Sequence, residues 1–84
     1  MSEVKIYSTQ SCPYCTAAKG FFQRKGIEPI EIDLTNEPEK LASLKKETGW
    51  MTVPQIFING DFVGGDDDVQ ELHRKGVLDS KLGI

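Results

Sequence analysis

The chain has 84 residues, of which 38% are hydrophobic and 27% charged, and its formal net charge is −3 at pH 7. A chain this short buries one modest hydrophobic core, so residues 1–84 are predicted to form a single domain. The acidic balance argues against nucleic acid as a partner, because the chain lacks a dense basic stripe that would neutralise phosphates.

Hydrophobic periodicity predicts the elements of the first half. Alternating apolar residues predict strands over residues 3–8 and 28–34. Between these strands, a helix is predicted to begin at Pro13 and to stop at Gly26. A second helix is predicted from near Asn36, with Pro38 in its first turn, to Gly49.

The second half is predicted to contain a hairpin and a last helix. Strands over residues 55–58 and 61–63 are joined by Asn59-Gly60, a strong hairpin signal, and a helix follows from the aspartate run 66–68 to about Gly76. The order β-α-β-α-β-β-α predicts an α/β fold, in which a mixed four-stranded sheet has helices packed on both faces. Residues predicted as core by this pattern are Phe21, Phe22, Ile32, Ile56, Phe57, Ile58 and Leu72.

The two cysteines, Cys12 and Cys15, lie at the junction of the first predicted strand and the first predicted helix. A disulfide closing so small a loop constrains the unfolded chain very little, so a redox pair or half of a metal site is the better interpretation. A thiolate at a helix N-terminus is stabilised by unpaired N–H groups and by the helix dipole. Cys12, at the exposed end, is therefore predicted as the nucleophile, and Cys15, about one turn further in, as the resolving thiol.

The metal interpretation of the cysteine pair requires additional ligands. A tetrahedral zinc or iron site needs four, and the chain offers no third cysteine and a single histidine, His73. We therefore expect no metal within one chain. A metal site shared between two chains remains the alternative.

Three short motifs occur in a fixed order along the chain: Cys12-Pro13-Tyr14-Cys15, Thr52-Val53-Pro54, and Gly64-Gly65 followed by Asp66-Asp67-Asp68. In these motifs the chain resembles the dithiol glutaredoxins of the thioredoxin-like superfamily. The resemblance covers about residues 4–78. It implies a thioredoxin-like fold and a glutathione-dependent thiol–disulfide oxidoreductase, which reduces protein disulfides and protein–glutathione mixed disulfides.

The resemblance also implies a groove for glutathione as co-substrate. It implies a cis bond at Val53-Pro54, with the Val53 backbone pairing with the cysteinyl part of glutathione. The backbone N–H groups of Asp66 and Asp67 would bind the γ-glutamyl carboxylate, while Asp66 is also expected to cap the last helix. The full set of expected glutathione-binding residues is Tyr14, Thr52, Val53, Pro54, Gln55, Gly65, Asp66 and Asp67.

The chain departs from the family pattern before the first cysteine. Many relatives have a lysine three residues before it, near the glycine carboxylate of glutathione, and this chain has Thr9 there. We expect the Gln55 amide to take over that contact, with Lys40 as the weaker candidate.

Two other functions stay open on sequence grounds: a thioredoxin-type electron donor, and an iron–sulfur carrier that bridges two chains through Cys12 and glutathione. Expected protein partners are glutathionylated or disulfide-containing proteins. The N-terminus has no signal-peptide pattern, and no apolar stretch approaches the roughly 20 residues that span a bilayer. A cytoplasmic monomer without membrane partners is therefore expected.

Overall fold

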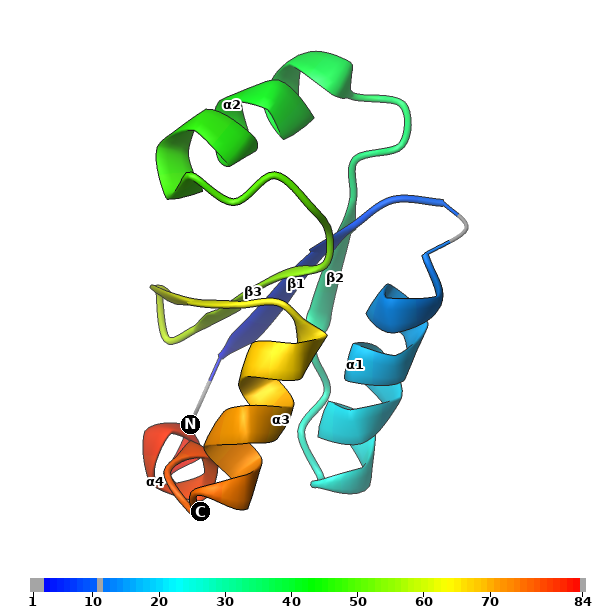
Figure 1. Cartoon of the computed structure of the whole chain (residues 1–84). Coiled ribbons are helices and arrows are strands. Elements are labelled where there is room, and N and C mark those ends of the chain that lie inside the picture. The colour runs from blue at the N-terminus through cyan, green and yellow to red at the C-terminus, as the bar shows by residue number, and fades with distance from the viewer. Residues whose placement is uncertain (1–2, 11, 84) are drawn as a thin grey trace.

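The computed structural model describes residues 3–10 and 12–83, and Figure 1 shows their arrangement. Its four-stranded sheet has the order β2-β1-β3-β4. Strand β1 pairs in parallel with β2 and antiparallel with β3, which pairs antiparallel with β4. The predicted mixed sheet is therefore confirmed, with strand bounds β1 (Val4–Ser8), β2 (Ile30–Asp33), β3 (Gln55–Ile58) and β4 (Asp61–Gly64).

The helices lie on both faces of the sheet, as predicted. Helices α1 (Pro13–Arg24) and α3 (Asp66–Arg74) lie on one side, and α2 (Pro38–Thr48) on the other (Figure 1). A fourth helix, α4 (Leu78–Leu82), was not predicted. Its two leucines are almost fully buried, so this short helix closes the lower end of the core.

One hydrophobic core fills the space between the sheet and the α1–α3 side. Alternate residues of β1, Val4 and Ile6, face this side, because successive side chains of a strand point to opposite faces. Leu72 is partly buried against the core. The core residues are Val4, Ile6, Ala18, Phe21, Phe22, Ile56, Ile58, Val69, Leu78 and Leu82, which includes four of the predicted ones.

Two residues predicted as core, Ile32 and Phe57, lie outside this cluster and are only half-buried. Phe57 points to the opposite face of β3 from Ile56 and Ile58, where its ring packs between Tyr7 at 5.5 Å and Phe62 at 5.3 Å between centroids. That face is covered less completely than the α1–α3 side, so the prediction that both residues belong to the core was wrong.

Candidate active site

The two cysteines lie where the chain enters α1. Pro13 is the first residue of the helix, a position where its missing N–H leaves no hydrogen bond unmade. Cys12 caps the helix in an extended conformation, and the Cys15 backbone N–H donates to the Cys12 sulfur at 3.2 Å. This donor belongs to the first helical turn, where N–H groups lack backbone acceptors. A negatively charged sulfur at Cys12 would be stabilised by it.

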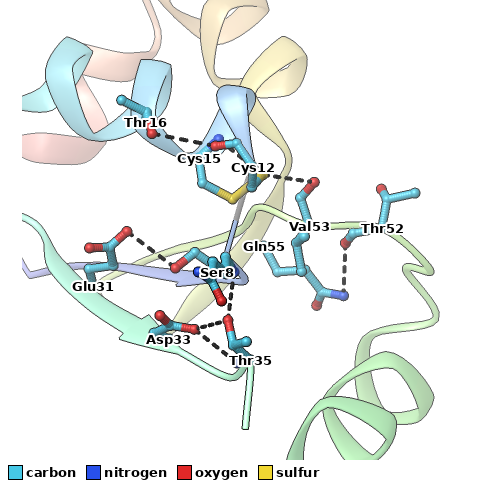
Figure 2. The surroundings of a disulfide bond; sticks show 11 residues. Ser8, Cys12, Cys15, Thr16, Glu31, Asp33, Thr35, Thr52, Val53 and Gln55 are labelled. Carbon is cyan, nitrogen blue, oxygen red and sulfur yellow. Dashed lines mark hydrogen bonds between the residues drawn. A yellow bond between two sulfur atoms is a disulfide. The ribbon is translucent and has the colours of Figure 1, made fainter. Parts of the chain in front are cut away.

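Cys12 and Cys15 form a disulfide in this structure, with their Cα atoms 5.2 Å apart (Figure 2). The two sulfurs differ in access. Cys15 is 2% exposed, whereas Cys12 is half-buried. An incoming thiolate therefore reaches Cys12 first, and Cys15 is placed behind it. This arrangement suits an outer attacking cysteine and an inner resolving cysteine.

The segment before β3 faces the cysteine pair. Its Val53-Pro54 peptide bond is cis, as the family resemblance implied. The Val53 carbonyl oxygen lies 3.9 Å from the Cys12 sulfur, as Figure 2 shows. An extended ligand that pairs with the Val53 backbone would thus bring its own sulfur close to Cys12.

A cavity of about 340 Å³ extends from this segment to the start of α3. We call it the Val53 groove. Seven of the predicted glutathione-binding residues line it, and two further residues, Trp50 and Asp68, also do. Trp50 could not be singled out by sequence, because a loop tryptophan is more often packing than a binding residue. The lining residues are Tyr14, Trp50, Thr52, Val53, Pro54, Gly65, Asp66, Asp67 and Asp68.

Gly65, at the start of α3, is the N-cap of that helix. Its N–H donates to Asp68 Oδ2 at 3.0 Å, so the third helical residue, Asp68, satisfies the backbone of the N-cap. The predicted capping by Asp66 is therefore wrong, because Asp66 is already the first helical residue. The first backbone N–H groups of α3 have no intrahelical acceptor and border the groove, which makes them available to a carboxylate.

Asp66 is unusual among the acidic residues of the groove. Burial raises the pKa of its carboxyl group, a hydrogen bond with Gln70 lowers it, and the charge of Asp67 raises it again. Within the described part of the chain, its Oδ1 atom is buried without a hydrogen-bond partner, and so is Nε1 of Trp50. Asp66 thus carries its negative charge at an energetic cost.

Gln55 does not line the Val53 groove. Its side chain is fully buried, and its amide nitrogen donates to the carbonyl oxygens of Trp50 at 2.7 Å and Thr52 at 3.3 Å. Its amide oxygen accepts from the Thr48 hydroxyl at 2.8 Å. Because the amide is occupied on both sides, the expected contact of Gln55 with a ligand carboxylate is replaced by a structural role. It holds the loop from α2 to β3, as Figure 2 shows for Thr52.

The weaker candidate, Lys40, also lies outside the Val53 groove. Its ammonium is 3.3 Å from the Glu37 carboxylate, and its side chain lines a different cavity on the α2 side of the sheet. Thr9, which occupies the position of the family's lysine, is half-buried in the segment after β1. Neither alternative to that lysine is therefore found in the groove.

Residues 3–10 and 12–83 contain neither a metal-binding cluster nor a membrane-spanning helix. Among these residues, no group of three or more His, Cys, Asp or Glu side chains is arranged to hold a metal ion. Over the same range, no helix has both the length and the apolar character needed to cross a bilayer. The exposed His73 instead packs its ring edge-on against Phe21, with centroids 5.2 Å apart.

Comparison with known proteins gives a consistent result. Residues 4–63 match the Glutaredoxin family model. A glutaredoxin of Pseudomonas aeruginosa is 48% identical over 82 residues, covering 98% of each chain. Glutaredoxin 3 of Escherichia coli K12 is 39% identical over 82 residues, covering 98% of this chain and 99% of its own. The crystal structure of a buckwheat glutaredoxin–glutathione complex superposes with a TM-score of 0.90 at 34% identity, covering 98% of this chain and 77% of that chain.

Proposed function

The chain belongs to the glutaredoxin family and is a thiol–disulfide oxidoreductase, and we propose that glutathione is its reductant. Its proposed substrates are protein–glutathione mixed disulfides and protein disulfides. The observation that carries the proposal is the Val53 groove, which runs from Val53, whose carbonyl oxygen lies 3.9 Å from the Cys12 sulfur, to the N-terminus of α3. The glutathione complex of the buckwheat relative supports the same ligand.

The chemistry of the groove suits the γ-glutamyl end and the cysteinyl part of the co-substrate. The γ-glutamyl end of glutathione is a zwitterion, with one carboxylate and one ammonium. The N–H groups at the start of α3 suit the carboxylate, and the Asp66 and Asp67 carboxylates suit the ammonium. The cysteinyl backbone would pair with Val53 as a short added strand, which directs the glutathione sulfur towards Cys12.

In the proposed monothiol route, the Cys12 thiolate attacks the glutathionyl sulfur of a mixed disulfide. A Cys12–glutathione disulfide forms, the original S–S bond breaks, and the protein thiolate leaves and takes up a proton. A second glutathione thiolate then attacks the glutathione sulfur bound to Cys12. Oxidised glutathione is released, and the Cys12 thiolate is regenerated.

In the proposed dithiol route, Cys12 attacks a protein disulfide and Cys15 displaces the reduced protein. The product is the Cys12–Cys15 disulfide, the state seen in this structure. Two glutathione molecules then reduce this disulfide to the dithiol and leave joined as oxidised glutathione. We also propose that the protein acts in the cytoplasm, where the glutathione pool, at roughly −220 to −320 mV, is poised to reduce glutaredoxins of about −200 to −230 mV.

The decisive experiment is turnover of a glutathionylated peptide with glutathione and glutathione reductase. Wild type, Cys12→Ser and Cys15→Ser are compared. Because the monothiol route needs only the outer sulfur, Cys12→Ser is expected to lose more than about 99% of the activity, and Cys15→Ser to keep most of it. Cys15→Ser is the matched control, since it removes one sulfur from the same helix.

Three results would contradict the proposal. Wild type that is inactive with glutathione but accepts electrons from thioredoxin reductase would make the chain a thioredoxin-type donor. A purified protein that carries an iron–sulfur chromophore and lacks turnover would favour the cluster-carrier alternative. Equal losses in the two serine variants would refute the monothiol route.

A further inference from the structure

A second cavity, of about 490 Å³, lies between the sheet and α2, on the face opposite to the main core. We call it the α2 groove. It shares no lining residue with the Val53 groove. Apolar side chains form its floor and polar ones its rim. The floor consists of Tyr7, Ile32, Leu34 and Leu44, and the rim of Glu37, Glu39, Lys40, Ser43 and Glu47.

The α2 groove is open because α2 covers this face of the sheet incompletely. Leu44 is the one buried residue of that helix, and most of its other side chains are charged or small. Tyr7 and Ile32, which are paired in the β1–β2 register, remain half-buried beneath it. The floor therefore keeps apolar surface in contact with solvent, which a partner's apolar side chain could cover.

The rim of the groove is strongly acidic. It carries three carboxylates against the single ammonium of Lys40, and that ammonium is already 3.3 Å from Glu37. Among the described residues, no ion pair within 4.0 Å involves Glu39 or Glu47. Two carboxylates at the rim are thus available to a cationic partner.

The spacing of these two carboxylates points to a peptide segment rather than a small cation. Glu39 lies in the first turn of α2 and Glu47 near its end. Eight residues of α-helix span about 12 Å, which is the length of roughly four extended residues. An extended segment can therefore place one basic side chain at each carboxylate and an apolar side chain between them on the floor.

The position of the groove relates it to the cysteine pair. Tyr7 of the floor lies in β1, the strand that leads to Cys12. Gln10, which lies between β1 and Cys12, contacts the segment between β2 and α2. Its backbone N–H donates to the Thr35 hydroxyl at 2.6 Å. A protein held in the α2 groove would therefore lie at the edge of the sheet where Cys12 acts.

We propose that the α2 groove docks a segment of a disulfide-bearing substrate protein, with an apolar side chain flanked by lysine or arginine. This inference rests on the proposed function for the identity of the partner as a substrate. The apolar floor supplies burial, and the acidic rim selects the flanking charges and speeds the encounter. Glutathione would still enter through the Val53 groove.

Binding of model peptides to ¹⁵N-labelled protein tests the proposal. The probe is the peptide Lys-Lys-Leu-Lys-Lys, and its twins carry Glu for Lys or Ala for Leu. We expect saturable shifts at the amides of Tyr7, Ile32 and Leu44 with the probe, and much weaker binding of both twins. Glu47→Lys is expected to weaken binding of the probe by about three- to tenfold, because a rim attraction becomes a repulsion.

Glu28→Lys is the matched control, since it changes the net charge equally at an exposed site before β2, away from the groove. It should alter the affinity less than twofold. An equal loss in Glu28→Lys would overturn the proposal in favour of a net-charge effect, and so would shifts confined to the Val53 groove. Shifts that depend on protein concentration without peptide would assign the groove to a second copy of the chain instead.

A kinetic measurement connects docking to turnover. With a disulfide peptide that contains the basic–apolar segment, Glu47→Lys should raise KM by the same factor as it weakens binding and leave kcat unchanged. An unchanged KM would overturn the role in substrate recognition. If wild type fails to turn over any glutathionylated substrate, the proposed function fails, but the peptide titration still decides whether the groove binds.

Discussion

Asp66 combines burial with negative charge at the mouth of the Val53 groove. Burial raises the pKa of its carboxyl group, and the hydrogen bond with Gln70 offsets this only in part. The folded state therefore binds a proton on Asp66 more readily than the unfolded chain does. Above its folded-state pKa, the ionised carboxylate reduces the stability of the fold. As the pH falls below the unfolded value of about 3.9, this cost disappears.

Asp66→Asn is accordingly expected to raise the melting temperature at pH 7, by up to about 3 °C, because it removes a charge that burial disfavours. The gain should shrink as the pH falls and vanish near pH 3, where Asp66 is protonated in both states. Thermal unfolding followed by circular dichroism between pH 3 and 7 measures this. Asp61→Asn, at the exposed start of β4, is the control for loss of one charge. A lower melting temperature for Asp66→Asn at pH 7 would contradict the argument.

Gln55 shows why the role of some residues near the site could not be predicted from the sequence. Because Gln55 follows the proline of the Thr52-Val53-Pro54 motif, its amide was expected to donate to the ligand. Its burial depends on three partners that only the folded chain assembles: the Thr48 hydroxyl and the carbonyls of Trp50 and Thr52. The seven expected residues that line the Val53 groove belong to short motifs, whose local sequence carries the information.

The N-terminus of α3 depends on the backbone conformation of Gly64, the residue before the N-cap Gly65. Gly64 has a φ of +113°, a conformation that residues with a side chain rarely adopt. A Cβ at this position would lie 2.6 Å from Asp68 Oδ2 and 2.7 Å from Asp68 Cγ. To relieve that contact, Asp68 would have to turn away and release the N–H of Gly65. The glycine is therefore needed for both geometry and capping.

Gly64→Ala is expected to destabilise the protein by about 2–4 kcal/mol, because backbone strain adds to the lost capping bond. Urea unfolding gives the free energy, and amide hydrogen exchange should show the loss concentrated in α3. Gly76→Ala is the matched control: its φ is +74°, but a Cβ there meets nothing within 4 Å. It should cost only about 1 kcal/mol. Equal losses in the two variants would mean that the contact with Asp68 is unimportant.

Short sequence signals, such as turn residues and hydrophobic alternation, explain which helices and strands could be predicted. Asn59-Gly60 indicated the hairpin, and both residues have positive φ values, of 52° and 88°, as a tight turn of this kind requires. The alternation of apolar residues identified both β1 and β2. It could not tell which side would be fully covered, because that depends on α2, whose charged surface leaves Ile32 half-buried. The short α4 was missed since five residues are too few for a periodic pattern.

For the molecule as a whole, stability and redox chemistry reside in different parts. The disulfide closes a loop with a sequence separation of 3, so it restricts the unfolded chain very little. Stability comes instead from the hydrophobic core that the described residues form between the sheet, α1 and α3. The cysteine pair can therefore cycle between dithiol and disulfide without a large change in the stability of the fold.

Phe22 tests this dependence on one core, because its side chain is fully buried among residues of the sheet and of α1. A small domain is stable by about 5–15 kcal/mol, and Phe→Ala in a core costs about 3–5 kcal/mol. Phe22→Ala is therefore expected to lose a large share of the total stability, measured by urea unfolding of the oxidised protein.

Phe62→Ala is the control on the opposite face of the sheet. The Phe62 ring is half-buried and contacts Trp50 and Phe57, so its removal should cost about 1–2 kcal/mol. A larger loss for Phe62 than for Phe22 would place the main stabilising contacts on the α2 side of the sheet. The α2 groove could then not remain open without a cost to the fold.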